Sequence, residues 1–356
     1  MKLRIRPLFI ILPLFILHYF IITRIANFAQ IFSTKPYAGI PLSQSAIKDA
    51  YYNGTAKDQK PEAVIPQRIH QIYHDWSGNG MPHSAQWGRL RASCIDRHPG
   101  WIYKLWSASE SREFLLREYP WFLPVYDSYR YPVQRVDAMK YFVLRHYGGI
   151  YIDLDNGCLE SLEPLRYYPV FTTDNNQGPL LNNILGSMPQ HPYYQLLTDS
   201  LPSFNWLYWP FPYLTIQYAS GGWFQTAIWE KYHRQNHYHN TDQPQDENGP
   251  LYRVIMDSRR GAEPWVFWNE GAGQTWENWD NSVFLWIGEH IYTVVRIVAA
   301  VSIVLVALIA ALVWKCCLRG RKEGMKTKAG LKTAVSLISP QLTQSEDIFA
   351  KKHDAV

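Results

Sequence analysis

The sequence predicts an α/β domain with a mostly parallel sheet, flanked by a transmembrane helix toward each end of the chain. Strand-like runs alternate with helix-like runs through its middle, which is typical of parallel sheets covered by helices. Two long apolar runs without a charged residue lie toward the two ends. With 356 residues, 47% of them apolar, the chain is long enough to bury a large core. Much of the formal net charge of +5 comes from the two ends, so it indicates no nucleic-acid surface.

Both apolar runs have the character of membrane segments. Residues 297–314 contain no charge, and at about 1.5 Å per residue such a run nearly crosses a hydrocarbon core of about 30 Å. The expected span is 294–314. The run at 7–23 predicts a transmembrane signal anchor, with a cleaved signal peptide as the alternative. Basic residues lie outside both runs, at 1–6 and 315–356, and this pattern places both ends in the cytosol.

The same topology places the middle of the chain in the lumen of the secretory pathway. Residues 24–65 are expected to form a lumenal linker before a domain at 66–290. The tail at 315–356 is rich in Lys, Ser and Thr, which indicates disorder. Cys94 and Cys158 are the cysteines of the lumenal part. An oxidising compartment permits a disulfide between them, but two free thiols remain open as well. No Cys/His cluster has the spacing of a zinc site.

Local signals define the elements of the domain in order. Ser/Glu capping chemistry begins a helix at 107–119. The strongest helical pattern has no breaker until Gly148-Gly149, as expected of a helix C-terminus. The expected elements are a strand at 68–73, a helix at 84–98, a strand at 101–106, helices at 107–119 and 133–147, a strand at 150–155, a pair of helices within 182–201 broken at Pro189 and Pro192, and a helix at 221–235 followed by a polar loop at 239–250.

Two carboxylates end the strand at 150–155. Residues two apart on a strand point to the same face, so Asp153 and Asp155 are expected to project together. They precede Asn156-Gly157 at the carboxyl end of the strand, where open α/β sheets bind ligands. Paired carboxylates can hold a hard divalent cation there, and such a cation bridges to phosphate oxygens and neutralises a leaving diphosphate. The alternative is a solvated strand end without a ligand.

These two aspartates belong to a longer stretch, VDAMKYFVLRHYGGIYIDLDNGCLESLEPL, which resembles the donor-binding core of glycosyltransferase family 32. The resemblance is strongest to the fungal mannosyl phosphorylinositol ceramide synthase-like branch of that family. Other segments are similar in the same order: IPQRIHQIYHDW, MPHSAQW, HPGWIYKLW, NNILGSMPQHPYY and ASGGWFQTAIWEKY. The resemblance covers about Pro66 to Trp279.

The resemblance implies a GT-A fold, a nucleotide-sugar donor, above all GDP-mannose, and transfer with retention of the anomeric configuration. It also implies Mn²⁺ or Mg²⁺ as the cofactor. Catalysis is assigned to Asp153 and Asp155. Asp155 is the direct metal ligand, and Asp153 contacts the sugar or ribose and orients the metal. Asp137 matches a family aspartate that binds donor sugar hydroxyls.

Two residues depart from the family's pattern. Lys140 stands where the family usually has Arg, so a point charge replaces a bidentate fork; Arg135 lies nearby and is expected to help bind the donor. Glu277 stands where a His is expected, in an element, EGAGQTWENWD, that closes over the donor diphosphate. A glutamate can ligate a cation, so Glu277 is expected as a third metal contact. Thr275 and Trp276 are expected donor contacts, with core packing as the alternative for Trp276.

Further donor contacts are assigned by their position in the resemblance. Amide side chains suit sugar hydroxyls, although asparagines are also ordinary loop residues. In the first strand, His70 and Gln71 are expected to contact the nucleotide through their backbone. The contacts in question are His70, Gln71, Asn182, Asn183, Ser220 and Gly221.

The resemblance implies a Golgi membrane enzyme that mannosylates inositol phosphorylceramide, a sphingolipid, and its branch often uses a regulatory membrane subunit. One alternative is a protein-glycan α-mannosyltransferase, which typically has a single N-terminal anchor. The other is a catalytically inactive membrane-bound homologue acting as a binding or assembly subunit, which Lys140 and Glu277 would support. The aromatic segment Ser203–Thr215 is expected either at the membrane interface, where Trp and Tyr are favoured, or as a buried loop.

Overall fold

The structure is a computed structural model. Its described residues are 38–53, 62–75, 85–176, 178–235, 250–271, 273 and 278–311, with a few isolated positions besides. The predicted signal anchor at 7–23, the tail at 315–356 and the loop at 239–250 lie almost entirely outside the described residues. The chain divides into one compact unit, Phe28–Ile291, and a second unit made of its two ends.

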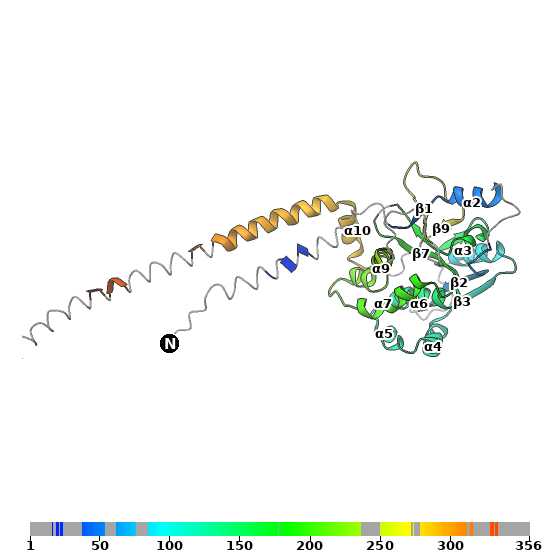
Figure 1. Ribbon diagram of the computed structural model, residues 1–356, viewed down its shortest axis with the longest axis horizontal. Coiled ribbons are helices and arrows are strands. Elements are labelled where there is room, and N and C mark those ends of the chain that lie inside the picture. Colours follow the sequence, from blue (N-terminus) through cyan, green and yellow to red (C-terminus); the bar gives the residue numbers. More distant parts are fainter. Residues whose placement is uncertain are drawn as a thin grey trace, which may run out of the picture. The chain divides into compact units, whose positions relative to one another are not determined.

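Helices and strands alternate along most of the compact unit (Figure 1). Its strands are β1 (Ile40–Leu42), β2 (Arg68–Ile72), β3 (Ile102–Trp106), β4 (Gly149–Ile152), β5 (Asn156–Cys158), β6 (Val170–Asp174), β7 (Leu181–Ser187), β8 (Leu251–Ile255) and β9 (Trp268–Glu270). Its helices are α2 (Gln44–Asn53), α3 (Ala85–Asp96), α4 (Ala108–Glu118), α5 (Leu123–Ser128), α6 (Pro132–Tyr147), the 3₁₀ helix η1 (Glu163–Tyr167), α7 (Pro192–Phe204), α8 (Pro212–Ala219), α9 (Gly222–Gln235) and α10 (Asn281–Glu289).

The main sheet has the strand order β1-β8-β6-β7-β4-β2-β3. Its neighbouring strands are parallel except where β7 takes part, because β7 runs antiparallel to both β4 and β6. β5 and β9 form a separate antiparallel pair. The predicted α/β class with a mostly parallel sheet is therefore confirmed. The reversed direction of β7 has a consequence for the site, since its first residues lie beside the carboxyl end of β4.

Helices cover both faces of this sheet, with α6, α7 and α9 on one side and α2 and α3 on the other (Figure 1). A hydrophobic core lies on each face of the sheet. Successive side chains of β4 point to opposite faces, so they pack alternately in the two cores. Tyr151 packs in the core beneath α6 and α7, whereas Ile150 and Ile152 pack in the core that also contains Cys94 and Cys158. All of these side chains are almost fully buried. The sheet is thus a rigid, two-sided support for the turn that follows β4.

The connection from α6 to β4 depends on two glycines. Gly148 has φ of 61° and Gly149 has φ of 100°, values that favour glycine. A Cβ on Gly148 would lie 2.7 Å from the backbone nitrogen of Pro189, and one on Gly149 would lie 2.7 Å from the carbonyl oxygen of Arg68. The double glycine of the motif therefore ends α6 and lets β4 approach β2 closely.

The structure corrects three expectations. The predicted linker at 24–65 contains β1 and α2, and β1 pairs with β8 in the main sheet. The predicted strand at 150–155 ends at Ile152, so Asp153 and Asp155 lie in a turn and do not alternate on a strand. The first helix expected within 182–201 is strand β7. For β1 and β7, pairing with other strands, which is a tertiary interaction, decides the conformation over the local sequence.

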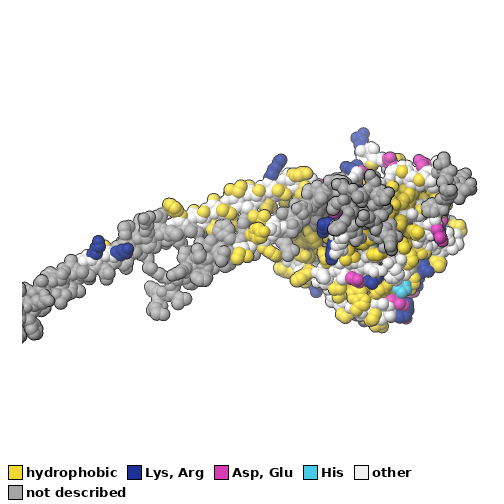
Figure 2. All heavy atoms as spheres, in the orientation of Figure 1, with side chains coloured by type: hydrophobic (Ala, Val, Ile, Leu, Met, Phe, Trp, Pro, Cys, Tyr) yellow, Lys and Arg dark blue, Asp and Glu magenta, His cyan; other side chains and the backbone are white. Residues whose placement is uncertain are grey.

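Ile291–Ala311 is a helix long and apolar enough to cross a membrane, and it is the one such helix among the described residues. Its mean hydropathy reaches 2.8, none of that window is buried, and Arg296 is its one charged residue. Hydrophobic side chains run along it (Figure 2). Its length and composition suit the predicted span at 294–314, while the orientation of the chain in a membrane stays a prediction.

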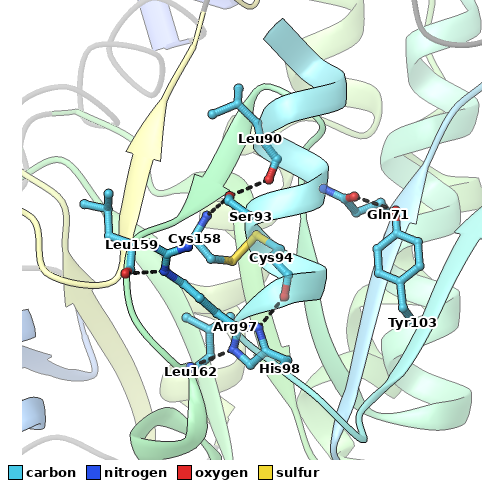
Figure 3. Close-up of a disulfide and its surroundings, with 10 residues drawn as sticks. All are labelled: Gln71, Leu90, Ser93, Cys94, Arg97, His98, Tyr103, Cys158, Leu159 and Leu162. Carbon is cyan, nitrogen blue, oxygen red and sulfur yellow. Dashed lines mark hydrogen bonds between the residues drawn. A yellow bond between two sulfur atoms is a disulfide. The ribbon is translucent and has the colours of Figure 1, made fainter. Parts of the chain in front are cut away.

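A disulfide joins Cys94 of α3 to Cys158 of β5 (Figure 3), and this settles a pairing that the sequence leaves open. Hydrogen bonds hold both partners in place. The backbone nitrogen of Cys158 donates to Oγ of Ser93 at 3.0 Å, and Nδ1 of His98 is 2.6 Å from the carbonyl oxygen of Cys94. Nε2 of His98 accepts from the backbone nitrogen of Leu162 at 2.8 Å. The cross-link therefore fixes β5, the strand directly after the two aspartates.

Candidate active site

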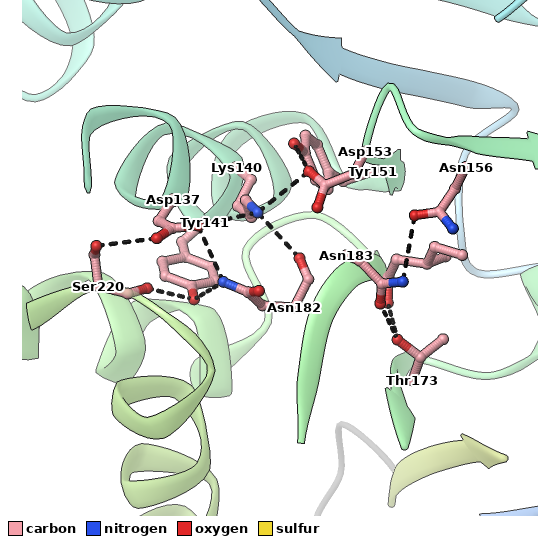
Figure 4. Close-up of polar contacts among 11 residues, drawn as sticks. Asp137, Lys140, Tyr141, Tyr151, Asp153, Asn156, Thr173, Asn182, Asn183 and Ser220 are labelled. Carbon is pink, nitrogen blue, oxygen red and sulfur yellow. Dashed lines mark hydrogen bonds and ion pairs between the residues drawn. The ribbon is translucent and has the colours of Figure 1, made fainter. Parts of the chain in front are cut away.

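A buried polar cluster gathers where β4 ends and β7 begins (Figure 4). Asp137 and Lys140 come from α6, one turn apart, and Asp153 comes from the turn after β4. Nζ of Lys140 lies 3.1 Å from Oδ1 of Asp137 and 3.4 Å from Oδ1 of Asp153. It also donates to the carbonyl oxygen of Asn182, at the start of β7, at 3.1 Å. One ammonium group therefore links a helix, a turn and a strand that the fold brings together.

Neutral groups complete the surroundings of Asp137. Nδ2 of Asn182 donates to its Oδ1 at 3.1 Å, and Oγ of Ser220, which follows α8, donates to its Oδ2 at 3.2 Å. The hydroxyl of Tyr141 donates to the carbonyl oxygen of Ser220 at 2.7 Å and accepts from Asn182. The predicted donor contacts Asp137, Lys140, Asn182 and Ser220 thus form one hydrogen-bonded network.

The charges of this network are strongly coupled. Burial raises the pKa of Asp137 to about 6, although Lys140 counteracts part of the shift. Burial also lowers the pKa of Lys140, but Asp153 and Asp137 outweigh it and raise that pKa overall. The hydroxyl of Tyr151 donates to Asp153, and the Lys140 ammonium lies 4.8 Å from the centre of the Tyr151 ring. Lys140 therefore stays charged and holds Asp153 in a fixed position.

Asp155 sits in the same turn, where negative charge accumulates. Its carbonyl oxygen accepts from the backbone nitrogen of Gly271 at 2.7 Å. A Cβ on Gly273 would lie 2.0 Å from Oδ2 of Asp155, so the chain passes directly against this carboxylate. Burial raises the pKa of Asp155 to about 7, and the charges of Asp153 and Glu270 raise it further. Lys140 offsets only part of this excess. The turn therefore favours a positively charged ligand.

The donor atoms of this turn fit a hard divalent cation. Carboxylate oxygens are the ligands that Mg²⁺ and Mn²⁺ prefer, and Asp153 and Asp155 supply them. In the part of the chain that the structure describes, no group of three or more His, Cys, Asp and Glu side chains is arranged to hold a metal. A cation here would complete its coordination with water and ligand oxygens. The predicted third contact, Glu277, and the donor contacts Thr275 and Trp276 lie outside the described residues.

A pocket of about 640 Å³ borders the cluster. Asn182, Asn183 and Glu270 line it near the two aspartates, and aromatic rings, among them Tyr213 and Trp223, line another part. Neither Lys nor Arg occurs among the described residues that line it. Aromatic faces with a few amide and carboxylate groups suit a neutral polyol better than a phosphate.

His70 and Gln71 have side chains that belong to the core. Nε2 of His70 donates to the carbonyl oxygen of Gly148 at 3.0 Å, and Nδ1 accepts from the indole nitrogen of Trp106 at 3.1 Å. Oε1 of Gln71 accepts from the hydroxyl of Tyr103 at 2.7 Å. Both side chains are fully buried. Their predicted backbone contacts to a nucleotide stay a prediction, since these side-chain contacts do not test it.

Three other predicted contacts lie near the cluster, and among them Asn183 joins it through its backbone, whose carbonyl oxygen accepts from the backbone nitrogen of Asp153 at 2.8 Å. Nη2 of Arg135 donates to the carbonyl oxygen of Tyr129 at 3.0 Å. The side chain of Asn183 bonds to Thr173, whose hydroxyl donates to its Oδ1 at 2.7 Å, and to Asn156. Gly221 directly precedes α9, and its backbone nitrogen donates to Ile216.

Sequence reasoning did not find Tyr141, Tyr151 or Glu270. Tyr141 follows Asp137 by four residues on a helix, a spacing that places both on one face. Tyr151 precedes Asp153 by two residues, and on a strand this spacing would place both side chains on one face. Glu270 shows no local signal, because β9 reaches the turn only by pairing with β5.

Comparison with known proteins agrees with this geometry. Residues 84–172 match the family described as glycosyltransferase sugar-binding region containing DXD motif. Inositol phosphoceramide mannosyltransferase 2 of Schizosaccharomyces pombe is 38% identical over 67% of this chain and 66% of its own length. Mannosyl phosphorylinositol ceramide synthase CSH1 of Saccharomyces cerevisiae is 36% identical over 68% of this chain and 61% of its own length.

A further relative, inositol phosphoceramide mannosyltransferase 1 of S. pombe, is 30% identical over 73% of this chain and 76% of its own length. Among solved structures, the PaToxG glycosyltransferase matches 62% of this chain and 82% of its own with a TM-score of 0.38 and 12% identity, too weak a likeness to support an argument.

The α/β fold and the DXD turn define a glycosyltransferase sugar-binding region. More narrowly, the chain belongs to the family of inositol phosphoceramide mannosyltransferases and mannosyl phosphorylinositol ceramide synthases. It spans 66%, 61% and 62% of the length of the first three curated relatives it matches.

Proposed function

We propose that this chain is a metal-dependent retaining glycosyltransferase that transfers mannose from GDP-mannose to inositol phosphorylceramide. The observation that carries the proposal is the acidic turn at Asp153 and Asp155, linked through Lys140 to Asp137 and bordered by a pocket suited to a polyol. The donor, the acceptor and the metal are inferred from the resemblance and from the names of the relatives, two of which are inositol phosphoceramide mannosyltransferases.

In the proposed reaction, the bond from mannose C1 to the diphosphate oxygen breaks and an acceptor hydroxyl oxygen bonds to C1 on the same face. The hydroxyl proton passes to the departing phosphate oxygen. Asp155 and Asp153 would hold a divalent cation, whose chemistry would be to neutralise charge on the departing diphosphate. Asp137 accepts hydrogen bonds from donor hydroxyls, and Asn182 and Ser220 hold its carboxylate in place. Lys140 holds Asp153 and balances its charge.

The pocket is the proposed site of the acceptor headgroup. An inositol ring presents hydroxyls at its edge and C–H groups on its faces, so amides and aromatic rings together suit it. Asn182 and Asn183 offer the amides, and Tyr213 and Trp223 offer the rings. The acceptor phosphate would lie outside the pocket, since no Lys or Arg is found among the described lining residues.

We propose a Golgi membrane location with the catalytic unit in the lumen and both termini in the cytosol. The disulfide between Cys94 and Cys158 suits an oxidising lumen, and the helix Ile291–Ala311 suits a membrane span. A regulatory membrane subunit is a further proposed partner, carried by the resemblance alone.

The test is sugar transfer by membranes that carry the full chain, its Asp155→Ala variant or its Asp127→Ala variant. Asp127 is the matched control, because its carboxylate forms an exposed ion pair with Arg112 away from the site. GDP-mannose, UDP-galactose and UDP-glucose are offered with inositol phosphorylceramide, with and without Mn²⁺. Metal-dependent mannolipid from the wild type and from Asp127→Ala, but at least 100-fold less from Asp155→Ala, is the expected result.

The same assay separates the alternatives. Mannose that appears on protein glycans and not on lipid would favour the protein-glycan α-mannosyltransferase. A folded chain that turns over no donor and binds no GDP in Mn²⁺ would contradict the enzyme proposal and favour a binding or assembly subunit.

A further inference from the structure

Two exposed apolar segments lie together on the compact unit. One is the loop between α7 and α8, where Trp206 is 67% and Trp209 is 82% exposed. The other is α10 and the residues before it, where Trp279 is 62% exposed and Trp286 is also exposed. We call these surfaces the aromatic rim. Its members are Trp206, Leu207, Tyr208, Trp209, Trp279, Val283 and Trp286.

Aromatic ring contacts and a hydrogen bond join the two segments of the rim. The Phe211 ring lies 5.6 Å from the Trp279 ring and 5.8 Å from the Phe284 ring, between centroids. Tyr213 stacks on Phe284 at 5.9 Å, and its backbone nitrogen donates to the buried carboxylate of Asp280 at 2.9 Å. The exposed tryptophans therefore stand on a packed base and not on a loose loop.

The composition of the rim indicates what covers it. No charged residue occurs from Ser203 to Ala219, and α10 contains only Glu289. Tryptophan and tyrosine, which combine an apolar ring with a hydrogen-bond donor, are enriched at the level of lipid headgroups. An apolar patch of this kind on a soluble surface usually marks an interaction site.

Chain connectivity identifies the partner. α10 ends at Glu289 and the apolar helix begins at Ile291, so only His290 separates them. A bilayer that takes up this helix from its first turns holds Trp286 within a few residues of its surface, whatever the orientation of the two units. We propose that the aromatic rim docks on the surface of the bilayer that contains Ile291–Ala311, with its tryptophans at the headgroup level.

Docking has a consequence for the pocket. Tyr213 and Phe284, which support the rim, also line the pocket beside Asn182. The pocket would then border the membrane surface, where a lipid headgroup lies. This consequence rests on the proposed function, whereas docking itself does not, so a failure of lipid transfer would leave docking intact.

Quenching of tryptophan fluorescence tests the proposal on the full chain in nanodiscs. One set of nanodiscs contains phosphatidylcholine brominated at the 6,7 positions of its acyl chain, and the other contains the unbrominated lipid. The variant Trp206→Phe/Trp209→Phe removes two emitters and keeps the surface apolar. The control is Trp121→Phe, an exposed tryptophan that packs on Phe142 of α6, outside the rim.

Bromolipid is expected to quench wild-type emission. The quenched part, which is the emission lost when bromolipid replaces the unbrominated lipid, should fall by roughly two fifths in the double variant if the rim tryptophans and Trp314 emit equally. Trp121→Phe should leave the quenched part unchanged. An equal quenched part in wild type and double variant, with both proteins folded by circular dichroism, would overturn the proposal and leave a protein partner as the occupant of the rim.

Discussion

Lys140 gives an example of how one residue type fits its site. Its buried ammonium meets three acceptors, the carboxylates of Asp137 and Asp153 and the carbonyl oxygen of Asn182. An ammonium has three donors on a compact tip, whereas a guanidinium presents five in a planar fork. The number of acceptors matches lysine. The departure from the arginine usual in the family therefore leaves a closed network, and Lys140 alone gives no reason to infer an inactive protein.

His70 makes a pH-dependent contribution to stability. Both ring nitrogens are used, with Nε2 donating to Gly148 and Nδ1 accepting from Trp106, so protonation would break the second bond. Burial lowers the pKa of His70 to about 3, and the nearby charge of Arg68 acts in the same direction. The unfolded chain therefore takes up this proton first as the pH falls. The contribution is complete above about pH 6.5 and is lost toward pH 3, by about 1.4 kcal/mol per pH unit in between.

The measurement is thermal unfolding of the full chain between pH 7.5 and 5. His70→Gln should be less stable than the wild type at pH 7.5 but lose less stability on acidification, by about 1.4 kcal/mol per pH unit. Equal pH slopes for the two proteins would contradict this assignment. His74 and His98, whose pKa values are also lowered by burial, are unchanged in both proteins and so cancel in the comparison.

At the scale of elements, the junction of α6 and β4 positions the acidic turn, and Gly149→Ala tests it. An alanine at 149 would have to keep the positive φ of the glycine, which is unfavourable for it. Its Cβ would also lie 2.7 Å from the carbonyl oxygen of Arg68 in the paired strand β2. The expected loss of unfolding free energy is about 3 kcal/mol.

Gly100→Ala is the matched control, because Gly100 also has a positive φ of 85° but would place its Cβ in open space. It should lose only about 1 kcal/mol. Chemical denaturation of both variants measures the difference. If the two lost equal stability, the close approach of β4 to β2 would not be what requires a glycine at 149.

Helices with capping residues or a clear periodic pattern could be predicted from the sequence. The prediction failed for strands whose conformation depends on pairing with distant parts of the chain. α4 begins with the expected capping box of Ser107 and Glu110, and α6 ends at the expected glycine. β7 was predicted as a helix because its sequence has no strand-like alternation, yet β4 and β6 both pair with it. β1 was missed because three residues in a polar stretch carry too little pattern.

The candidate site divides in the same way. Asp137, Lys140 and Asp153 could be predicted because they lie in one motif, on a helix and on the turn that follows the next strand. Glu270 could not, since it reaches Asp155 only through the pairing of β9 with β5. Local sequence thus identifies the chemistry of the acidic turn, but not the set of charges around it.

At the scale of the whole molecule, the disulfide connects compartment, stability and site. Cys94 and Cys158 are 64 residues apart, and closing a loop of that length in the unfolded chain stabilises the folded state by about 4 kcal/mol in the chain-entropy model. Cys158 ends β5, and the backbone of Gly271, just after the partner strand β9, bonds to Asp155. The cross-link therefore also limits movement of the acidic turn.

We expect the Cys94→Ala/Cys158→Ala variant to melt about 10 °C below the wild type, since each kcal/mol shifts the melting temperature of a unit of this size by about 2–4 °C. A reducing agent should lower the melting temperature of the wild type and leave that of the variant unchanged, which separates loss of the bond from loss of side-chain packing. Thiol labelling under non-reducing conditions, in unfolded protein, supplies the independent readout. Labelled Cys94 and Cys158 peptides from untreated wild type would show that the disulfide is absent in the membrane where the chain resides, and would remove the main structural support for an oxidising lumen.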